Sequence, residues 1–293
     1  MLDLYQNLPH TINPVAFTVG FLSVRWYSVM FLVGFWVVFT LLCWRIRVGE
    51  AEINKQTLFD LLLIAFVGGL IGGRISYVII YDAAYFFTNV SQIFSPFNLS
   101  DGSFQGLYGM SYHGALVGSL LGIYFFAIFK KLNFLMLADF IVPALPAGYF
   151  FGRIGNFMNG ELFGRVTNSE FGMYFANSPT TLRYPSQIFE AFGEGIFLFC
   201  LLWKIRNQKT FPQGSISWFY IFGYSGLRFV CEFFRQPDLQ LGFVFWGLTM
   251  GQILSLISIF VLFFLLFLKN QKSAIIKKQL MKVNLGCIRK SSF

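Results

Sequence analysis

Residues 152–165 read Gly-Arg-Ile-Gly-Asn-Phe-Met-Asn-Gly-Glu-Leu-Phe-Gly-Arg and form the densest polar cluster in a very apolar chain. This signature stretch follows an apolar segment that should leave a membrane near Phe151. Two arginines, two asparagines and a glutamate are interleaved with four glycines, so the backbone can turn sharply beside a ligand. An anionic head group fits this chemistry, because an arginine can fork onto a phosphate. The alternative is an ordinary Gly/Asn-rich loop after a helix.

The composition of the chain is that of a polytopic membrane protein. Hydrophobic residues make up 56% of its 293 residues, aromatic residues 20% and charged residues only 12%, which excludes an ordinary soluble domain. Apolar segments long enough to cross a membrane recur at residues 22–44, 58–81, 110–129, 134–151, 186–203, 215–234 and 247–268. We therefore expect an all-α fold with about seven transmembrane helices. No internal repeat separates them, so we expect a single integral membrane domain over residues 1–293.

The basic residues indicate an orientation. Fifteen of the 22 Lys and Arg lie in the connections 45–57, 130–133 and 204–214 and in the tail 269–293. The long connection 82–109 has none, so the positive-inside rule predicts an N-terminus outside and a C-terminus in the cytoplasm. We expect 82–109 to form an outer arm on the membrane surface, and residues 152–185 an outer loop. The basic tail suits anionic membrane lipid, and no nucleic-acid motif accompanies it.

Lysine and arginine are divided between the two sides. All eleven lysines fall on the expected cytoplasmic side, and the basic residues left over are all arginine, at positions 25, 74, 153, 165, 183, 228 and 235. Arginine keeps its charge when buried and binds phosphate through a planar fork, which favours oxyanion recognition at the outer face. The alternative, that arginine tolerates interfaces better than lysine, explains the division equally well.

Charged residues also recur at helical spacing inside apolar segments. Glu190 and Glu194 are four residues apart, as are Arg228 and Glu232, so each pair shares a helix face. Two like charges in a membrane need protonation or arginine partners, and Arg153 and Arg228 are the obvious candidates. An intrahelical salt bridge between Arg228 and Glu232 is the simpler interpretation, and it is compatible with a functional one.

Prolines and glycines predict two features of the helices. Pro143 and Pro146 should kink or break the fourth apolar segment just before the signature stretch. Glycines at 68, 69, 72 and 73 precede Arg74, so a neighbouring helix can approach closely there and Arg74 should face the interior.

His113 is one of two histidines and begins an apolar segment, where an imidazole needs a partner or a function. From its position alone, a structural and a functional histidine are equally good interpretations. His10, in the polar N-terminal region, is expected to have no specific role.

Residues 152–164 resemble the signature of the bacterial phosphatidylglycerol–prolipoprotein diacylglyceryl transferases, a family of integral membrane enzymes. Three further stretches are similar to the same family and follow in its order: Val24-Arg-Trp-Tyr27, Gly109-Met-Ser-Tyr-His-Gly114 and Arg228-Phe-Val-Cys-Glu-Phe-Phe-Arg-Gln-Pro-Asp238. Two positions depart from the family, Ser28 and Ala115, where glycine is usual.

The resemblance implies an enzyme of the bacterial inner membrane that works at the outer leaflet. Its substrates would be phosphatidylglycerol and precursor lipoproteins with a lipobox cysteine. The diacylglyceryl group would pass to the cysteine thiol, forming a thioether while glycerol phosphate leaves, as the first step of lipoprotein maturation. No cofactor and no metal is implied.

Carried onto this chain, the resemblance implies catalytic roles for His113, Arg153, Arg228 and Glu232. His113 would be the general base, and the arginines would stabilise charge on the departing phosphate. Substrate contacts are implied for Arg153, Asn156, Asn159, Glu161, Gly164, Tyr27, Glu190 and Tyr224. Whether Arg228 with Glu232 activates the thiol instead is left open.

Three rival classes lack the residues they need. A divalent-ion lipid transferase would show paired aspartates at helical spacing or a His/Cys cluster. A transporter built like this should have repeat-related halves, and an intramembrane hydrolase needs Gly-x-Ser-x-Gly or an aspartate pair. The sequence contains none of these patterns.

Overall fold

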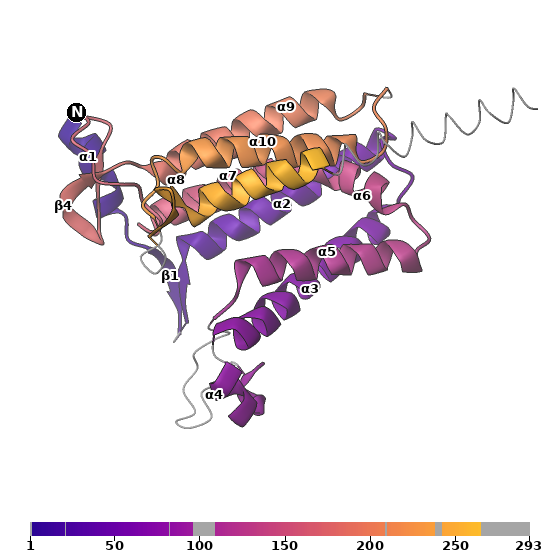
Figure 1. The fold of residues 1–293 in the computed structure, drawn as a ribbon, viewed down its shortest axis with the longest axis horizontal. Helices are drawn as coiled ribbons and strands as arrows, with labels where there is room; N and C mark the ends of the chain where they lie inside the picture. Colours follow the sequence, from indigo (N-terminus) through magenta and orange to yellow (C-terminus); the bar gives the residue numbers. More distant parts are fainter. Residues whose placement is uncertain are drawn as a thin grey trace, which may run out of the picture. The chain divides into compact units, whose positions relative to one another are not determined.

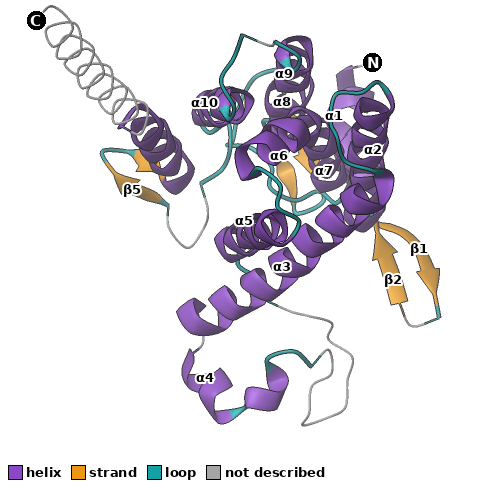
Figure 2. Cartoon of the chain, turned by 90° about the vertical axis from the view of Figure 1, so that its right-hand side faces the viewer, coloured by secondary structure: helices purple, strands orange, loops and turns teal. Residues whose placement is uncertain are grey.

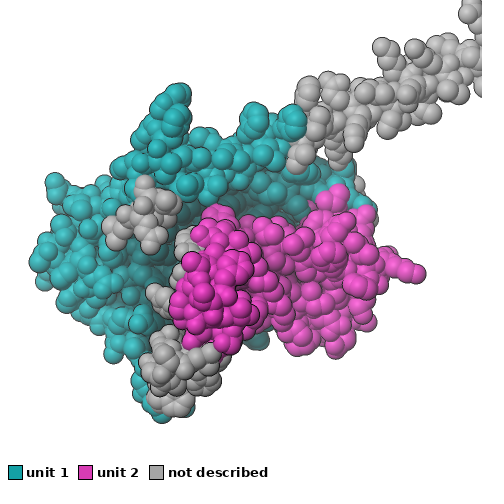
Figure 3. All heavy atoms as spheres, turned by 60° about the horizontal axis from the view of Figure 1, so that its bottom comes forward, with its two compact units in different colours: residues 1–39, 142–293 teal, residues 40–141 magenta. Residues whose placement is uncertain are grey.

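The computed structural model describes residues 2–20, 22–81, 83–95, 109–208, 210–237 and 242–264. Within these ranges the chain is mostly helical, with three short antiparallel hairpins (Figures 1 and 2). It divides into two compact units, coloured in Figure 3: unit 1 is Met1–Phe39 with Val142–Phe293, and unit 2 is Thr40–Ile141. The expected single domain stays a prediction. The basic tail 269–293 and much of the expected outer arm lie outside the described residues.

Unit 1 begins with α1 (Leu2–Thr11) and a hairpin of β1 (Val15–Val19) and β2 (Leu22–Arg25), followed by α2 (Trp26–Arg47), which continues into unit 2. The hairpin pairs Val15 with Arg25, and the Trp26 N–H donates to the Pro14 carbonyl at 3.0 Å. The first apolar segment therefore becomes helical only at Trp26, four residues later than the sequence pattern predicts.

The fourth apolar segment is interrupted where its two prolines predict. Helix α6 (Phe134–Ile141) passes into a 3₁₀ turn, η2 (Val142–Ala144), and then into α7 (Leu145–Met158). Pro146 lies in the first turn of α7, where its missing N–H removes no helical hydrogen bond. Beyond Phe151 the chain stays helical to Met158, and Gly160, with φ +66°, ends the helix. The expected outer loop 152–185 thus begins as helix.

Glycines bring α2 and α7 into close contact within unit 1. A Cβ at Gly34 would lie 2.8 Å from the Gly148 carbonyl oxygen, and one at Gly155 would lie 2.9 Å from the Cα of Tyr27. Real Cβ atoms do not come this close to backbone, so glycine is needed at both crossings. The second crossing sets the signature stretch beside the first turn of α2.

The rest of unit 1 surrounds α7 with helices. After the hairpin β3 (Met173–Phe175) and β4 (Ser178–Arg183), one continuous helical segment consists of α8 (Ser186–Glu190), the π-helix η3 (Ala191–Phe197) and α9 (Leu198–Ile205). It is followed by α10 (Ser215–Cys231), the hairpin β5 (Phe243–Phe245) and β6 (Leu248–Thr249), and a last helix, Met250–Phe264. A π-helical turn inside an α-helix is frequent at functional sites.

Unit 2 contains α3 (Lys55–Tyr81), α4 (Ala83–Thr88), η1 (Val90–Gln92), α5 (Tyr112–Phe129) and α6. The backbones of helices α3 and α5 are in close contact. A Cβ at Gly72 would lie only 2.8 Å from the Cα of Gly118, so there is no room for a side chain at this crossing. The Ser119 hydroxyl adds a hydrogen bond of 2.8 Å to the Ala65 carbonyl. The close helix approach expected from the glycines is confirmed.

Helices occupy each of the seven expected apolar segments. Among the described residues, three are both long and apolar enough to cross a membrane: Trp26–Arg47, Lys55–Ile80 and Phe134–Met158. The helices His113–Phe129 and Met250–Phe264 are apolar but shorter. A helical membrane protein is therefore confirmed, whereas the count of seven spans and the orientation of the termini stay predictions.

Candidate active site

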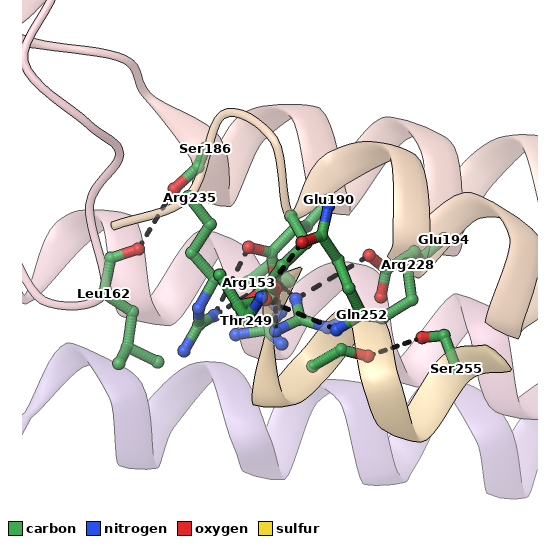
Figure 4. A network of polar contacts seen from close by, with 12 residues as sticks. Arg153, Leu162, Ser186, Glu190, Glu194, Arg228, Arg235, Thr249, Gln252 and Ser255 are labelled. Carbon is green, nitrogen blue, oxygen red and sulfur yellow. Dashed lines mark hydrogen bonds and ion pairs between the residues drawn. The ribbon is translucent and has the colours of Figure 1, made fainter. Parts of the chain in front are cut away.

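Glu190 is the centre of a buried charge network in unit 1 (Figure 4). Arg153 Nε lies 2.9 Å and Arg228 Nη1 3.0 Å from Glu190 Oε2, and Arg235 Nη1 lies 3.3 Å from Oε1. The three arginines come from α7, from α10 and from the turn after α10. Taking a carboxylate out of water costs several kcal/mol. Three cations around one carboxylate offset that cost.

Arg228 connects Glu190 to two further glutamates. Its Nη2 lies 2.6 Å from Oε2 of Glu232, the residue that directly follows α10, and its Nη1 lies 3.9 Å from Oε1 of Glu194. The salt bridge at four-residue spacing is therefore confirmed, and Glu190 and Glu194 face one arginine as their spacing predicts. Counted with Arg153 and Arg235, the network holds three arginines and three glutamates, so its formal charge is zero.

Tyr149, one turn before Arg153 in α7, ties two of the glutamates together. Its hydroxyl lies 2.5 Å from Glu194 Oε2 and 3.3 Å from Glu190 Oε2, and it accepts a hydrogen bond of 2.7 Å from Arg153 Nε. A hydroxyl has one hydrogen to donate, and the shorter distance assigns it to Glu194. The ring of Tyr224 packs edge-on against the Tyr149 ring at 5.8 Å between centroids.

The polar side chains of the signature stretch form a chain of hydrogen bonds that starts at Arg153. Arg153 Nη1 donates to Asn156 Oδ1 at 3.3 Å, and Asn156 Nδ2 donates to Glu161 Oε1 at 2.9 Å. Asn159 Nδ2 donates to the same Glu161 oxygen at 3.5 Å, while Asn159 Oδ1 accepts from the backbone N–H of Tyr27 at 3.2 Å. The signature is thereby fixed to the first turn of α2.

Gly164 is buried where the signature meets the end of α10. Its N–H donates to the Tyr184 carbonyl at 2.8 Å, and a Cβ here would lie 2.5 Å from the carbonyl oxygens of both Tyr184 and Phe234. Only glycine fits such a gap, so this residue seats the signature against α10. The substrate contact expected of Gly164 stays a prediction.

His113 lies in unit 2, in the first turn of α5, and its side chain is exposed. The other site residues expected from the sequence all lie in unit 1, where the contacts above join most of them. The role of His113 stays a prediction.

Five buried polar atoms in unit 1 make no hydrogen bond to the described residues. They are Gln187 Oε1, Glu194 Oε1, Arg228 Nη1, Glu232 Oε2 and Gln252 Nε2. Three of them still belong to ion pairs of Arg228, whereas the two glutamine atoms have no such compensation. Buried polar groups in proteins are nearly always satisfied, and leaving one unsatisfied costs about 1–3 kcal/mol. The two glutamine atoms therefore need a partner such as an ordered water or a polar ligand.

Several members of the network were not singled out from the sequence. Tyr149 lies four residues before Arg153, so its helical spacing could have revealed it. Thr249 and Gln252 fit the Thr-x-x-Gln pattern of a helix start, which also can be read from sequence. Glu161 was expected, but not its partner Gln187, whose Nε2 donates to the Glu161 carbonyl at 2.7 Å. That contact joins residues too far apart in the sequence for any local pattern.

No three His, Cys, Asp or Glu side chains come together as metal ligands in the part of the chain that the structure describes. The expectation of a reaction without metal or cofactor stays a prediction.

Comparison with known proteins gives one consistent result. A family model described as prolipoprotein diacylglyceryl transferase matches residues 14–268. The phosphatidylglycerol–prolipoprotein diacylglyceryl transferase of Chlorobaculum tepidum is 45% identical over 258 residues, which are 87% of this chain and 89% of that protein. The enzyme of the same name from Rickettsia bellii is 42% identical over 247 residues, 84% and 90% of the two chains. That from Campylobacter jejuni subsp. doylei is 40% identical over 258 residues, 87% and 93%.

Proposed function

This chain belongs to the prolipoprotein diacylglyceryl transferase family, and from that premise we propose that it transfers the diacylglyceryl group of phosphatidylglycerol to precursor lipoproteins. The acceptor is the thiol of the lipobox cysteine. The product is a thioether, glycerol phosphate leaves, and the reaction is the first step of lipoprotein maturation.

The observation that supports this chemistry most directly is the buried network around Glu190. The planar guanidinium of arginine can bind a phosphodiester through two parallel hydrogen bonds. Glu190 Oε2 already holds Arg153 Nε at 2.9 Å and Arg228 Nη1 at 3.0 Å. Arginines fixed by carboxylates need not reorganise when a phosphate arrives. We assign these two residues to the phosphate of the lipid.

In the proposed reaction, the thiolate attacks the carbon of the diacylglyceryl group that carries the phosphate. The new S–C bond forms as the C–O bond to phosphate breaks, and the bonding electrons leave with the phosphate oxygen. Negative charge therefore grows on the departing glycerol phosphate, where cations stabilise the transition state more than the ground state. Glu232, 2.6 Å from Arg228, orients that guanidinium.

The thiol must lose its proton before or during attack, because the thiolate is the nucleophile. We assign His113 as the general base that accepts this proton. The assignment is supported by the Tyr-His-Gly motif, and the alternative is that Arg228 with Glu232 favours the thiolate.

The hydrogen-bonded signature supplies head-group contacts in this proposal. Asn156 and Asn159 are polar, buried and held by Glu161, so their amides are pre-oriented for ester or hydroxyl oxygens. Tyr27, a residue that is 39% exposed, and Tyr224 are proposed to border the same head group.

We place the enzyme in the bacterial inner membrane with its active face toward the outer leaflet. The support is the distribution of basic residues, fifteen on one side against none in 82–109. Reporter fusions after residue 100 should be active only with an outside-reporting enzyme, and fusions after residue 275 only with an inside-reporting one. The opposite result at either point would reverse the proposed face.

One assay tests the proposed function directly. The purified protein is incubated with phosphatidylglycerol and a precursor peptide that carries a lipobox. The peptide should gain the mass of one diacylglyceryl group at its cysteine while glycerol phosphate appears in equal amount. A peptide with serine in place of cysteine is the control and should remain unmodified. Transport or hydrolysis of the lipid without peptide modification would overturn the proposal.

A further inference from the structure

The last helix, Met250–Phe264, begins with a capping box whose side chains are all buried. The backbone N–H of Thr249 donates to Gln252 Oε1 at 3.0 Å, and the backbone N–H of Gln252 donates to Thr249 Oγ1 at 3.3 Å. In such a box each side chain satisfies a backbone donor that the helix leaves unpaired. This capping box is buried, since Thr249 is 2% and Gln252 1% exposed.

The capping box contacts the charge network through the Thr249 hydroxyl. Thr249 Oγ1 donates its hydrogen to Glu232 Oε1 at 3.0 Å, while the other oxygen of Glu232 faces Arg228 at 2.6 Å. Glu232 is thus held from both sides, one oxygen by a hydroxyl and the other by a guanidinium. Figure 4 shows Thr249 and Gln252 within the same cluster as Arg153 and Arg228.

Gly251 shows how closely the start of this helix is fitted to Glu232. A Cβ at Gly251 would lie 2.8 Å from the carboxyl carbon of Glu232 and 2.9 Å from each of its oxygens. A side chain at position 251 would therefore displace the Glu232 carboxylate from its place against this first turn. A helix start also carries partial positive charge, which favours a carboxylate there.

The Gln252 amide has an unused donor. Its oxygen must be the atom facing the Thr249 N–H, since only oxygen can accept, and this fixes Nε2 on the opposite side of the amide. Nε2 is buried and makes no hydrogen bond to any described residue. An oriented, buried amide without a partner points to a ligand that supplies an acceptor.

We propose that Thr249 is a positioning residue for Glu232, and through it for Arg228, and that the Gln252 amide binds an acceptor oxygen of the phospholipid head group. This inference rests on the proposed function and extends its site to the last helix. It gives the two residues separate tasks. Thr249 acts on the group that stabilises the departing phosphate, whereas Gln252 contacts the bound lipid.

The transfer assay with phosphatidylglycerol and a lipobox peptide separates these tasks. Thr249→Val keeps the shape and removes the hydroxyl, and should lower kcat roughly 10- to 100-fold with little change in KM for the lipid. Thr249→Ser keeps the hydroxyl and should restore most of kcat. Gln252→Met should raise KM for phosphatidylglycerol a few-fold to about tenfold, with a smaller change in kcat.

A matched control and a second variant guard against simple loss of folding. Ser255→Ala removes a hydroxyl one turn further along the same helix. This hydroxyl donates to the Gly251 carbonyl of its own helix, so the variant should leave kcat and KM unchanged. Gln252→Glu keeps the capping box but lacks the amide donor, so it too should raise KM for the lipid.

The outcomes are distinguishable. If the parent enzyme transfers the lipid and Thr249→Val works as well as Ser255→Ala, the positioning role is wrong while the proposed function stands. Equal losses in Thr249→Val and Thr249→Ser would also overturn it, because the hydroxyl would not matter. A normal KM in Gln252→Glu would remove the lipid contact. If the parent protein transfers nothing, the proposed function fails and this inference fails with it.

Discussion

Two arginines of this protein have different surroundings: Arg228 in unit 1, whose side chain is 14% exposed, and Arg74 in unit 2, which is 5% exposed. Arg228 is surrounded by carboxylates, at 2.6 Å from Glu232 and 3.0 Å from Glu190. Arg74 donates instead to backbone carbonyls, from Nε to Ile93 at 2.5 Å, from Nη2 to Gln92 at 3.0 Å and from Nη1 to Gly109 at 3.1 Å.

Aromatic rings complete the second environment. The Arg74 guanidinium lies 4.9 Å from the centroid of Phe86 and 5.9 Å from that of Tyr77. Carbonyls and rings hold the Arg74 guanidinium in one place through hydrogen bonds and cation–π contacts. Arg74 lies in α3, and its hydrogen bonds therefore fix two segments against that helix: the residues around η1 and the residues that precede α5. This comparison predicts that an arginine held among carboxylates takes part in function, whereas an arginine held by carbonyls and rings supports the fold.

The change with the largest expected effect is Glu190→Gln, because it removes the carboxylate shared by three arginines. Breaking a buried ion pair by removing one partner costs about 3–5 kcal/mol. We expect transfer activity to be lost and the thermal midpoint of the detergent-solubilised protein to fall. Glu52→Gln, at an exposed glutamate of the connection 45–57, is the control and should change neither measurement. A stable and active Glu190→Gln protein would show that the network is not the site.

His113→Gln tests the assignment of His113 as the general base. A general base contributes roughly 10²- to 10⁴-fold to a rate, so activity in the transfer assay should fall by that factor. His10→Gln, at the exposed histidine of α1, should retain the parent rate. Should His113→Gln turn over nearly as fast as the parent, the base would have to be sought in Arg228 with Glu232.

Much of the site could be predicted because it depends on local spacing. The pairing of Arg228 with Glu232 follows from one helical turn, and the break before α7 follows from Pro143 and Pro146. The polar residues of the signature stretch were expected to act together, and Asn156 and Glu161 do form a hydrogen bond. Each of these features involves residues within a few positions of one another.

Contacts between distant parts of the chain could not be predicted in the same way. Nothing local to Glu190 indicates that Arg235 will reach it, or that Thr249 will donate to Glu232. The start of α2 was also missed, because Leu22–Arg25, which directly precede the apolar run, pair with Val15–Val19 as a strand. Such choices depend on tertiary packing, which outweighs local propensity.

Arg153→Lys and Arg228→Lys test whether the network needs the two parallel hydrogen bonds of a guanidinium or only its positive charge. Lysine keeps the charge and loses at least one charge-assisted hydrogen bond, worth roughly 1.5–3 kcal/mol. At about 1.4 kcal/mol per tenfold, kcat/KM should fall on the order of 10- to 100-fold while the protein remains in the membrane. The measurement is the transfer assay on membranes with matched amounts of each variant.

Arg47→Lys is the appropriate control for this pair. Arg47 is exposed at the end of α2, so a topology signal there needs only positive charge. The neighbouring Arg45 also counts as basic in the sequence, but it is 3% exposed and pairs with Glu50 at 2.5 Å, so its replacement would disturb structure. Equal, mild losses at Arg47, Arg153 and Arg228 would mean that the outer arginines are interfacial anchors and that no phosphate fork exists.

Arg74→Lys should have the smallest effect on catalysis, and it tests the comparison from the other side. A lysine cannot reach three carbonyls arranged around a planar guanidinium, so part of the anchoring of the segment Val90–Gln92 is lost. Each hydrogen bond lost from a charged donor costs about 1.5–3 kcal/mol, which for a chain of 293 residues corresponds to a fall of roughly 2–5 °C in the thermal midpoint. Assayed well below that midpoint, KM for phosphatidylglycerol should equal that of the parent, because no contact of Arg74 described above involves the network around Glu190. A rise in KM as large as that of Arg228→Lys, with an unchanged midpoint, would place Arg74 among the lipid-binding residues and remove the distinction between the two arginines.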